Sequence, residues 1–127
     1  MTRILIVDDS FPARGGLRRL IEENKGWEVC GEAIDGHDAI NRVRETAPDV
    51  ILLDFQMPVM NGLQAAREIV KLRPGVQILL CTLHISRTLV REAQSAGIRG
   101  TVAKGESDQI VQGIEALLRH ETFFGWN

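Results

Sequence analysis

Five polar side chains follow the apolar segments of the 127-residue chain, each at a point where such a segment ends. They are Asp8, Asp9, Asp54, Thr82 and Lys104. A carboxylate can act as a nucleophile, paired carboxylates can bind a divalent cation, and lysine and threonine can donate hydrogen bonds to anionic oxygens. Phosphoryl transfer requires this combination of nucleophile, metal ion and donors. The residue types therefore predict that Asp54 takes up a phosphoryl group beside a cation held by Asp8 and Asp9.

Each of these residues has an ordinary structural explanation when it is considered alone. Asp8 or Asp9 could cap a helix, and Asp54 could be a turn residue. Thr82 could simply end a strand, and Lys104 could be a surface lysine. Five groups of fitting type at four segment ends are hard to obtain by accident, so we interpret them as one site.

The segments that must position these residues predict an α/β fold. Five short apolar runs, mostly Ile, Val and Leu, are unbroken rather than alternating, as is typical of parallel strands buried on both faces. The predicted strands cover residues 4–7, 29–33, 50–53, 76–81 and 100–103. Helical stretches separate them and are long enough for right-handed crossovers. We therefore expect a doubly wound five-stranded parallel sheet with helices on both faces, a flavodoxin-like three-layer sandwich.

The order 2-1-3-4-5 is a common arrangement for such a sheet, and it would bring the three aspartates together. The first and third strands would then be neighbours, about 4.8 Å apart. Each pair of carboxylates at about 4 Å repels by roughly 4 kcal/mol at an effective dielectric near 20. Either a proton is retained or a cation enters, and a compact cluster of oxygen ligands suits Mg²⁺.

These residues resemble the receiver domain of two-component response regulators. The similarity rests on Val7-Asp8-Asp9-Ser10, on Leu53-Asp54-Phe55-Gln56-Met57-Pro58 with Asn61-Gly62, on Thr82 and on Lys104. It covers essentially all of residues 1–120, so we expect a receiver domain there and a tail or linker remnant at residues 121–127.

The resemblance implies a place in a phosphorelay. A histidine kinase would present a phosphohistidine, and Asp54 would attack it to form an acyl phosphate. Asp9 and Asp54 would bind Mg²⁺ directly, Asp8 would contribute mainly through water, and the carbonyl of Gln56 would be a further ligand. The protein would catalyse only its own phosphorylation and dephosphorylation.

The resemblance also implies how the phosphorylated state would be recognised. Lys104 would contact the phosphoryl group and Thr82 would move toward it, which would shift the face formed by the fourth strand and the fourth and fifth helices. A homodimer could form through that face. Residues 80–84 and the helix after them are similar to receivers that precede a LuxR-type helix-turn-helix domain, which implies transcription regulation. Such a domain would follow the fifth helix, and 127 residues leave no room for one.

The composition of the chain limits which partners and which cellular compartment we expect. The net charge of −2 gives no general affinity for nucleic acid, so we expect no direct nucleic-acid binding by this chain. The sequence has no apolar run of the roughly 18 residues that a membrane span requires. Cys30 and Cys81 lie in apolar segments and indicate reduced thiols in a cytoplasmic protein. In the predicted strand order these two cysteines lie about 14 Å apart, too far for a disulfide.

Three positions near the site differ between receivers. An aromatic residue is common three residues before the lysine, where this chain has Thr101. This chain therefore has no aromatic side chain at the position whose rotation is usually coupled to the movement of the threonine. Gln56 and His84 lie two residues after Asp54 and Thr82, and we expect them to set the lifetime of the acyl phosphate.

Two other functions are consistent with parts of the pattern. A haloacid dehalogenase-type phosphatase also uses a strand-end aspartate, but it has a second aspartate two residues later, where Gln56 cannot act as an acid or base. A receiver-like module could also bind partners without phosphorylation. The sequence has neither GxxxxGK[ST] nor GxGxxG after a strand, so we expect no nucleotide cofactor.

Some remaining residues are interpreted structurally. Arg14, Arg18 and Arg19 form the densest basic cluster, which is typical of a solvated helix face. Asn61, Ser86 and Ser107 are predicted helix N-caps. The terminal aromatics Phe123, Phe124 and Trp126 could dock a partner or a second copy, cover the fifth helix, or belong to a linker remnant.

Overall fold

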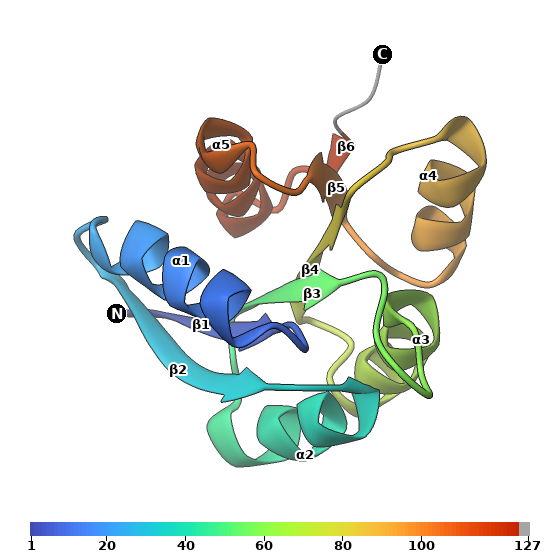
Figure 1. The fold of residues 1–127 in the computed structure, drawn as a ribbon, viewed down its shortest axis with the longest axis horizontal. Coiled ribbons are helices and arrows are strands. Elements are labelled where there is room, and N and C mark those ends of the chain that lie inside the picture. Colours follow the sequence, from blue (N-terminus) through green and yellow to red (C-terminus); the bar gives the residue numbers. More distant parts are fainter. Residues whose placement is uncertain (125–127) are drawn as a thin grey trace.

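The computed structural model describes residues 1–124, which form alternating strands and helices (Figure 1). The strands are β1 (Thr2–Val7), β2 (Trp27–Ala33), β3 (Val50–Asp54), β4 (Gln77–Thr82), β5 (Gly100–Ala103) and β6 (Phe123–Phe124). The helices are α1 (Phe11–Glu22), α2 (Gly36–Thr46), α3 (Gly62–Leu72), α4 (Arg87–Ser95) and α5 (Ser107–Leu118).

All strands belong to one parallel sheet in the order β2-β1-β3-β4-β5-β6. Helices α1 and α5 cover one face, and α2, α3 and α4 cover the other (Figure 1). The predicted doubly wound sheet and its strand order are confirmed, and β6 is an additional strand that was not predicted. None of the helices in residues 1–124 has the length and apolar character to cross a membrane.

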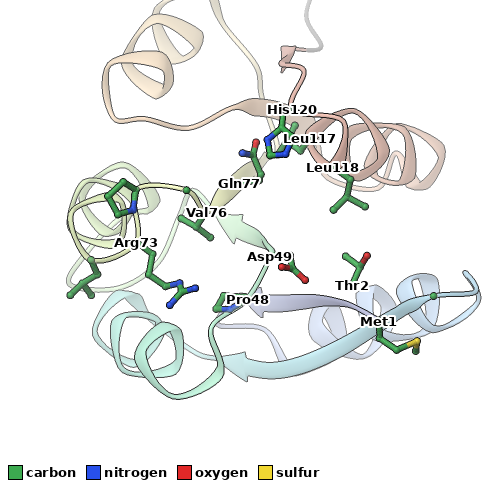
Figure 2. A pocket seen from close by; sticks show the side chains of 14 residues that line it. Met1, Thr2, Pro48, Asp49, Arg73, Val76, Gln77, Leu117, Leu118 and His120 are labelled. Atoms are coloured by element: carbon green, nitrogen blue, oxygen red, sulfur yellow. The ribbon is translucent and has the colours of Figure 1, made fainter.

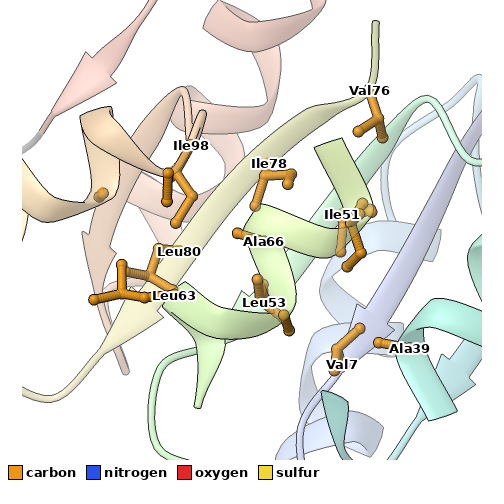
Figure 3. Close-up of a cluster of buried hydrophobic side chains, with 14 of the residues drawn as sticks. Val7, Ala39, Ile51, Leu53, Leu63, Ala66, Val76, Ile78, Leu80 and Ile98 are labelled. Carbon is orange, nitrogen blue, oxygen red and sulfur yellow. The ribbon is translucent and has the colours of Figure 1, made fainter. Parts of the chain in front are cut away.

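The central strands are buried on both faces, which explains their unbroken apolar sequences. Every residue of β3 is buried, with Ile51 and Leu53 in one core cluster and Val50 and Leu52 in the other. Figure 3 shows the first cluster, in which Ile51 and Leu53 belong together with the α3 residue Ala66. Burial of each large aliphatic side chain contributes about 1.5–3 kcal/mol, so this sheet is a rigid support for the polar residues at its ends.

The helix N-caps are partly as predicted. The side chain of Asn61 accepts a hydrogen bond in a complete capping box, and the hydroxyl of Ser86 accepts one from the start of α4. The prediction for Ser107 is wrong, because Ser107 is already the first helical residue. The preceding Glu106 occupies the cap position without a capping hydrogen bond.

The cysteines agree with the strand order. Cys30 lies in β2 and Cys81 in β4, which are separated by β1 and β3. Both are free thiols, as predicted. Burial raises the pKa of the Cys81 thiol to about 12, so this cysteine stays protonated within the core.

The terminal aromatics cover their own domain. Phe123 and Phe124 form β6 beside β5, and each is partly buried against a core cluster. They therefore extend the sheet rather than form a free tail. Trp126 lies outside the described residues.

Thr101 carries an unsatisfied polar group inside this sheet. It is fully buried in β5, and its hydroxyl has no hydrogen-bond partner within residues 1–124. Valine has the same branched shape without the hydroxyl, so we expect Thr101→Val to raise the free energy of unfolding by about 1 kcal/mol. Urea unfolding monitored by circular dichroism measures this difference. If Thr101→Val instead lowered the free energy of unfolding by a similar amount, this would contradict the conclusion that the Thr101 hydroxyl is unsatisfied.

Candidate functional site

The ends of β1 and β3 bring three carboxylates together. Val7 pairs with Leu53 in the register of the sheet, so the residues that follow, Asp8 and Asp54, emerge side by side. One carboxylate oxygen from each of Asp8, Asp9 and Asp54 lies within 4.8 Å of the others. Asp8 and Asp54 are buried, at 3% and 2% exposure, whereas Asp9 is exposed. The site therefore has a buried floor and an open acidic rim.

Lys104 lies between the two buried carboxylates. Its Nζ atom lies 2.8 Å from Asp54 Oδ1 and 3.5 Å from Asp8 Oδ2. Its backbone N–H donates to the carbonyl of Thr82 at 2.8 Å, which fixes the residue just beyond β5. Within residues 1–124, one lysine pairs with Asp8 and Asp54 in this cluster of three carboxylates, which leaves about two negative charges without a counter-charge.

The carboxylate of Asp54 is only partly satisfied. Oδ1 accepts hydrogen bonds from Lys104 and from the backbone N–H of Gln56, the latter at 3.3 Å. Oδ2 is buried and has no hydrogen-bond partner within residues 1–124. Burial disfavours the charged form and raises the pKa of Asp54; the hydrogen bond from Lys104 opposes this, and the charge of Asp8 adds to it.

Lys104 remains charged in spite of its partial burial. Burial alone would lower its pKa, but the hydrogen bond to Asp54 and the charges of Asp54 and Asp8 together raise it. The site therefore holds a permanent cation against a carboxylate that is costly to keep ionised.

These groups line an open cleft of about 630 Å³. The lining residues are Asp8, Asp9, Ser10, Asp54, Phe55, Gln56, Met57, Pro58, Asn61 and Lys104. Thr82 is not among them. It is buried, and its hydroxyl donates to the backbone carbonyl of His84 at 3.3 Å. The structure thus brings five of the six predicted site residues to one cleft, and Thr82 is buried outside its lining.

Comparison with known proteins identifies this arrangement. A family model described as "Response regulator receiver domain" matches residues 4–115. The chain is a response regulator receiver domain. Receiver domains generally bind Mg²⁺ at an acidic pocket and are phosphorylated by histidine kinases, and Asp8, Asp9 and Asp54 form an acidic cluster in this chain.

Individual relatives agree with this assignment. The chain is 40% identical over 118 residues to the response regulator UvrY of Escherichia coli K12, which covers 92% of the chain and 54% of UvrY. It is 38% identical over 102 residues to the chemotaxis protein CheY of Thermotoga maritima, 80% of the chain and 84% of CheY. A LuxR-family two-component response regulator from Aurantimonas superposes with a TM-score of 0.93 at 36% identity, over 98% of the chain and 90% of that structure. The chain spans about half the length of UvrY.

The receiver domain has a larger cavity, of about 920 Å³, at the opposite edge of the sheet (Figure 2). Its lining residues include Asp49, Arg73, Gln77 and His120. Asp49 is the one carboxylate among its lining residues, and it already accepts a hydrogen bond from the backbone N–H of Arg3 at 2.8 Å. We assign the function to the smaller cleft because the convergent charges lie there.

Two local contacts that the sequence did not predict orient Asp8 in this receiver domain. The backbone N–H of Ser10 donates to Asp8 Oδ1 at 2.8 Å, while the Ser10 hydroxyl caps α1 by accepting from Ala13. The N-cap of α1 is therefore Ser10 and neither aspartate. This excludes helix capping as the explanation for Asp8 and Asp9. Arg14 donates to the backbone carbonyl of Asp8 at 2.8 Å.

The interpretation of the arginine cluster as a solvated face is wrong for Arg14. Its side chain is only 12% exposed and pairs with Glu32 at 2.8 Å, and Arg18 contacts the same carboxylate at 2.8 Å. The pairing joins α1 to β2 and supports the Asp8 backbone. The available signal was Glu32 itself, a charged residue inside the predicted strand at residues 29–33.

The Glu32 pairing predicts an acid-dependent loss of stability. Burial alone would raise the pKa of Glu32, but the hydrogen bonds from Arg18 and Arg14 outweigh it and lower the pKa. The contribution is therefore present above the unfolded-state pKa, about 4.3, and is lost as pH falls through the lower folded value. We expect Glu32→Gln to reduce the free energy of unfolding by about 1 kcal/mol at pH 7 and by progressively less below about pH 4.

Glu28→Gln is the matched control, because Glu28 lies on the same strand. Its contact with Arg3 is longer, at 3.8 Å, and both side chains are 42% exposed. Urea unfolding from pH 3 to pH 7 measures both variants. Equal effects of the two substitutions at pH 7 would contradict a structural role for the Arg14–Glu32–Arg18 pairing.

Proposed function

We propose that this receiver domain accepts a phosphoryl group on Asp54 from the phosphohistidine of a histidine kinase. The observation that supports it best is the convergence of Asp8, Asp9, Asp54 and Lys104 in one cleft at the carboxyl edge of the sheet. The protein acts in phosphorelay signalling, and its chemistry is limited to its own phosphorylation and dephosphorylation.

The residues have distinct tasks in this reaction. The Asp54 carboxylate attacks the phosphorus atom, a P–O bond forms, and the P–N bond to the kinase imidazole breaks with its electron pair leaving on the imidazole. Lys104 favours the ionised form of Asp54 before the attack and offers its charge to the phosphoryl oxygens afterwards. The β3 strand, buried along its whole length, fixes the nucleophile.

The residues present fit a bound Mg²⁺. Asp9 and Asp54 would hold the ion directly, Asp8 mainly through water, and the Gln56 carbonyl would be a further ligand. The fit rests on the unpartnered, buried Asp54 Oδ2 and on the two negative charges that Lys104 leaves without a counter-charge. When bound, the ion neutralises the carboxylates and the phosphoryl oxygens.

We further propose that phosphorylation switches a partner-binding face formed by β4, α4 and α5. A second copy of the chain is one partner that could bind there, which would form a homodimer. Thr82 is the residue that links the site to this face, because it ends β4 and its backbone carbonyl accepts a hydrogen bond from the N–H of Lys104, which lines the cleft. The 36% identity to a LuxR-family response regulator favours an output in transcription.

Incubation with acetyl phosphate tests the reaction class. We expect a mass gain of one phosphoryl group that requires Mg²⁺ and is prevented by EDTA, with uptake falling at least about a hundredfold without the ion. p-Nitrophenyl phosphate serves as a free phosphomonoester, and we expect no sustained turnover of it. Continuous turnover would instead support a phosphatase. Absence of any mass gain would support a phosphorylation-independent interaction module.

A further inference from the structure

Strand β6 is placed on the edge of β5 by a defined chain reversal. The N–H of His120 donates to the carbonyl of Leu117 at 2.9 Å, and the N–H of Glu121 donates to that of Ala116 at 3.0 Å. His120 is left-handed, with φ of 61°, so the end of α5 forms a Schellman motif. This turn directs the next residues to β5, where the N–H of Phe123 donates to the carbonyl of Arg99 at 3.0 Å.

Two glycines make room for β6. A Cβ atom at Gly100 would lie 2.7 Å from the carbonyl oxygen of Phe123, a backbone atom that cannot turn aside. A Cβ atom at Gly113 would lie 3.2 Å from Cδ2 of the Phe123 ring. The edge of β5 and the adjacent face of α5 are therefore shaped to accept this strand.

The two aromatics of β6 point to opposite faces of the sheet, because successive strand residues alternate. Phe123 packs against the cluster beneath α1 and α5, and Phe124 packs against the cluster beneath α2, α3 and α4. In the register of the sheet Phe124 is the direct neighbour of Thr101, and Thr101 is the neighbour of Leu80. These three residues form one row across β4, β5 and β6 on the α4 side.

This row lies next to Thr82. Thr82 follows Leu80 by two residues on β4, so both side chains are on the same face. In the register Ala103 is the direct neighbour of Thr82, and Thr101, a small and fully buried side chain, lies diagonally between Thr82 and Phe124. Space left by a displaced Thr82 is thus bordered on β5 by two side chains too small to fill it and, one strand further, by a large aromatic ring.

We propose that Phe124 is a positioning residue for Thr82 and that β6 docks more tightly on β5 when Asp54 is phosphorylated. This inference rests on the proposed function, in which Thr82 moves toward the phosphoryl group. That movement opens space beside Thr101, and tightly packed interiors do not tolerate such a void. The Phe124 ring packs further inward to fill it and draws β6 onto β5. Binding equilibria coupled in this way are reciprocal, so docked β6 in turn favours the displaced position of Thr82.

Backbone hydrogen exchange in the full chain, with and without acetyl phosphate and Mg²⁺, tests the inference. Intact mass in the same samples reports phosphorylation. We expect the amide of Phe123, which donates to the carbonyl of Arg99 on the β5 side, to exchange at least about fivefold more slowly in the phosphorylated protein, the lower end of typical coupling between sites. A mass gain with unchanged exchange would overturn this inference and leave the proposed function standing. No mass gain would overturn both.

Phe123→Ala and Phe124→Ala form a matched pair, because each removes one half-buried ring from β6. Both should speed exchange of β6 in the unphosphorylated state. Only Phe124→Ala should remove the slowing on phosphorylation, whereas Phe123→Ala keeps it. Phe124→Leu, which retains an apolar side chain of intermediate size, should restore part of it. Equal loss of the slowing in the two alanine variants would show that Phe124 only stabilises the strand and would overturn the positioning role.

Discussion

Replacing Asp54 with alanine is expected to abolish phosphoryl uptake from acetyl phosphate. The variant lacks the nucleophile, and no other residue of the cleft is held against Lys104 as closely as Asp54, whose Oδ1 lies 2.8 Å from Nζ. We expect the initial rate to fall at least about a thousandfold, equivalent to ~4 kcal/mol in transition-state stabilisation. Intact mass spectrometry over a time course with Mg²⁺ present measures the rate.

Asp49→Ala provides the matched control for this experiment. Asp49 lies immediately before β3, at the opposite end of the strand that Asp54 terminates, and it is exposed. Its removal should leave the rate within about twofold of wild type, because rate effects of that size correspond to well under 1 kcal/mol. Uptake that survives in Asp54→Ala and is lost in Asp49→Ala would place the acceptor at the wrong end of the strand.

The second large effect is expected at Gly62, the first residue of α3. An added Cβ atom would lie 2.6 Å from the carbonyl oxygen of Asp54, 3.0 Å from Cα of Phe55 and 2.9 Å from Cδ1 of Leu80. Two of these atoms are backbone, so the chain around Asp54 must shift. We expect Gly62→Ala to lower the free energy of unfolding by about 2–3 kcal/mol. We also expect it to slow phosphorylation up to about a hundredfold, as misplacement of a reacting group by about 1 Å can do.

Gly15→Ala is the control for this substitution. Gly15 lies inside α1, and a Cβ atom there would meet nothing within 4 Å. Alanine in an open helical position should raise the free energy of unfolding by up to about 1 kcal/mol and leave the phosphorylation rate unchanged. Urea unfolding and the same mass assay distinguish the two variants. A neutral Gly62→Ala would mean that α3 does not pack against the nucleophile as closely as the structure shows.

The fold was largely predictable because β3 and β4 are buried on both faces. Their sequences are therefore apolar at almost every position, which identifies them as strands of a parallel sheet. Unbroken apolar runs such as residues 50–53 are typical of strands in a parallel sheet, and the segments between them show the hydrophobic period of a helix. Strand β6 was not predictable in this way. Two residues are too few to show a period, and their place depends on Gly100 and Gly113, which are distant in sequence.

The site was predictable where it depends on strand ends and was not where it depends on side-chain pairing. Asp8, Asp54 and Lys104 follow directly from the ends of β1, β3 and β5. The role of Arg14 depends on Glu32 across the β2 side of the sheet, and a basic residue on a helix does not reveal its partner. Thr82 was expected at the cleft, but its hydroxyl is turned to the His84 carbonyl instead.

The most direct test of phosphorylation at Asp54 is to locate the phosphoryl group after incubation of the wild-type protein with acetyl phosphate and Mg²⁺. Tryptic cleavage separates residues 4–14, with Asp8 and Asp9, from residues 45–67, with Asp49 and Asp54. We predict a single phosphoryl group on residues 45–67, assigned to Asp54 by fragment masses. A group on residues 4–14 or on Asp49, or no phosphoryl group on any peptide, would contradict it.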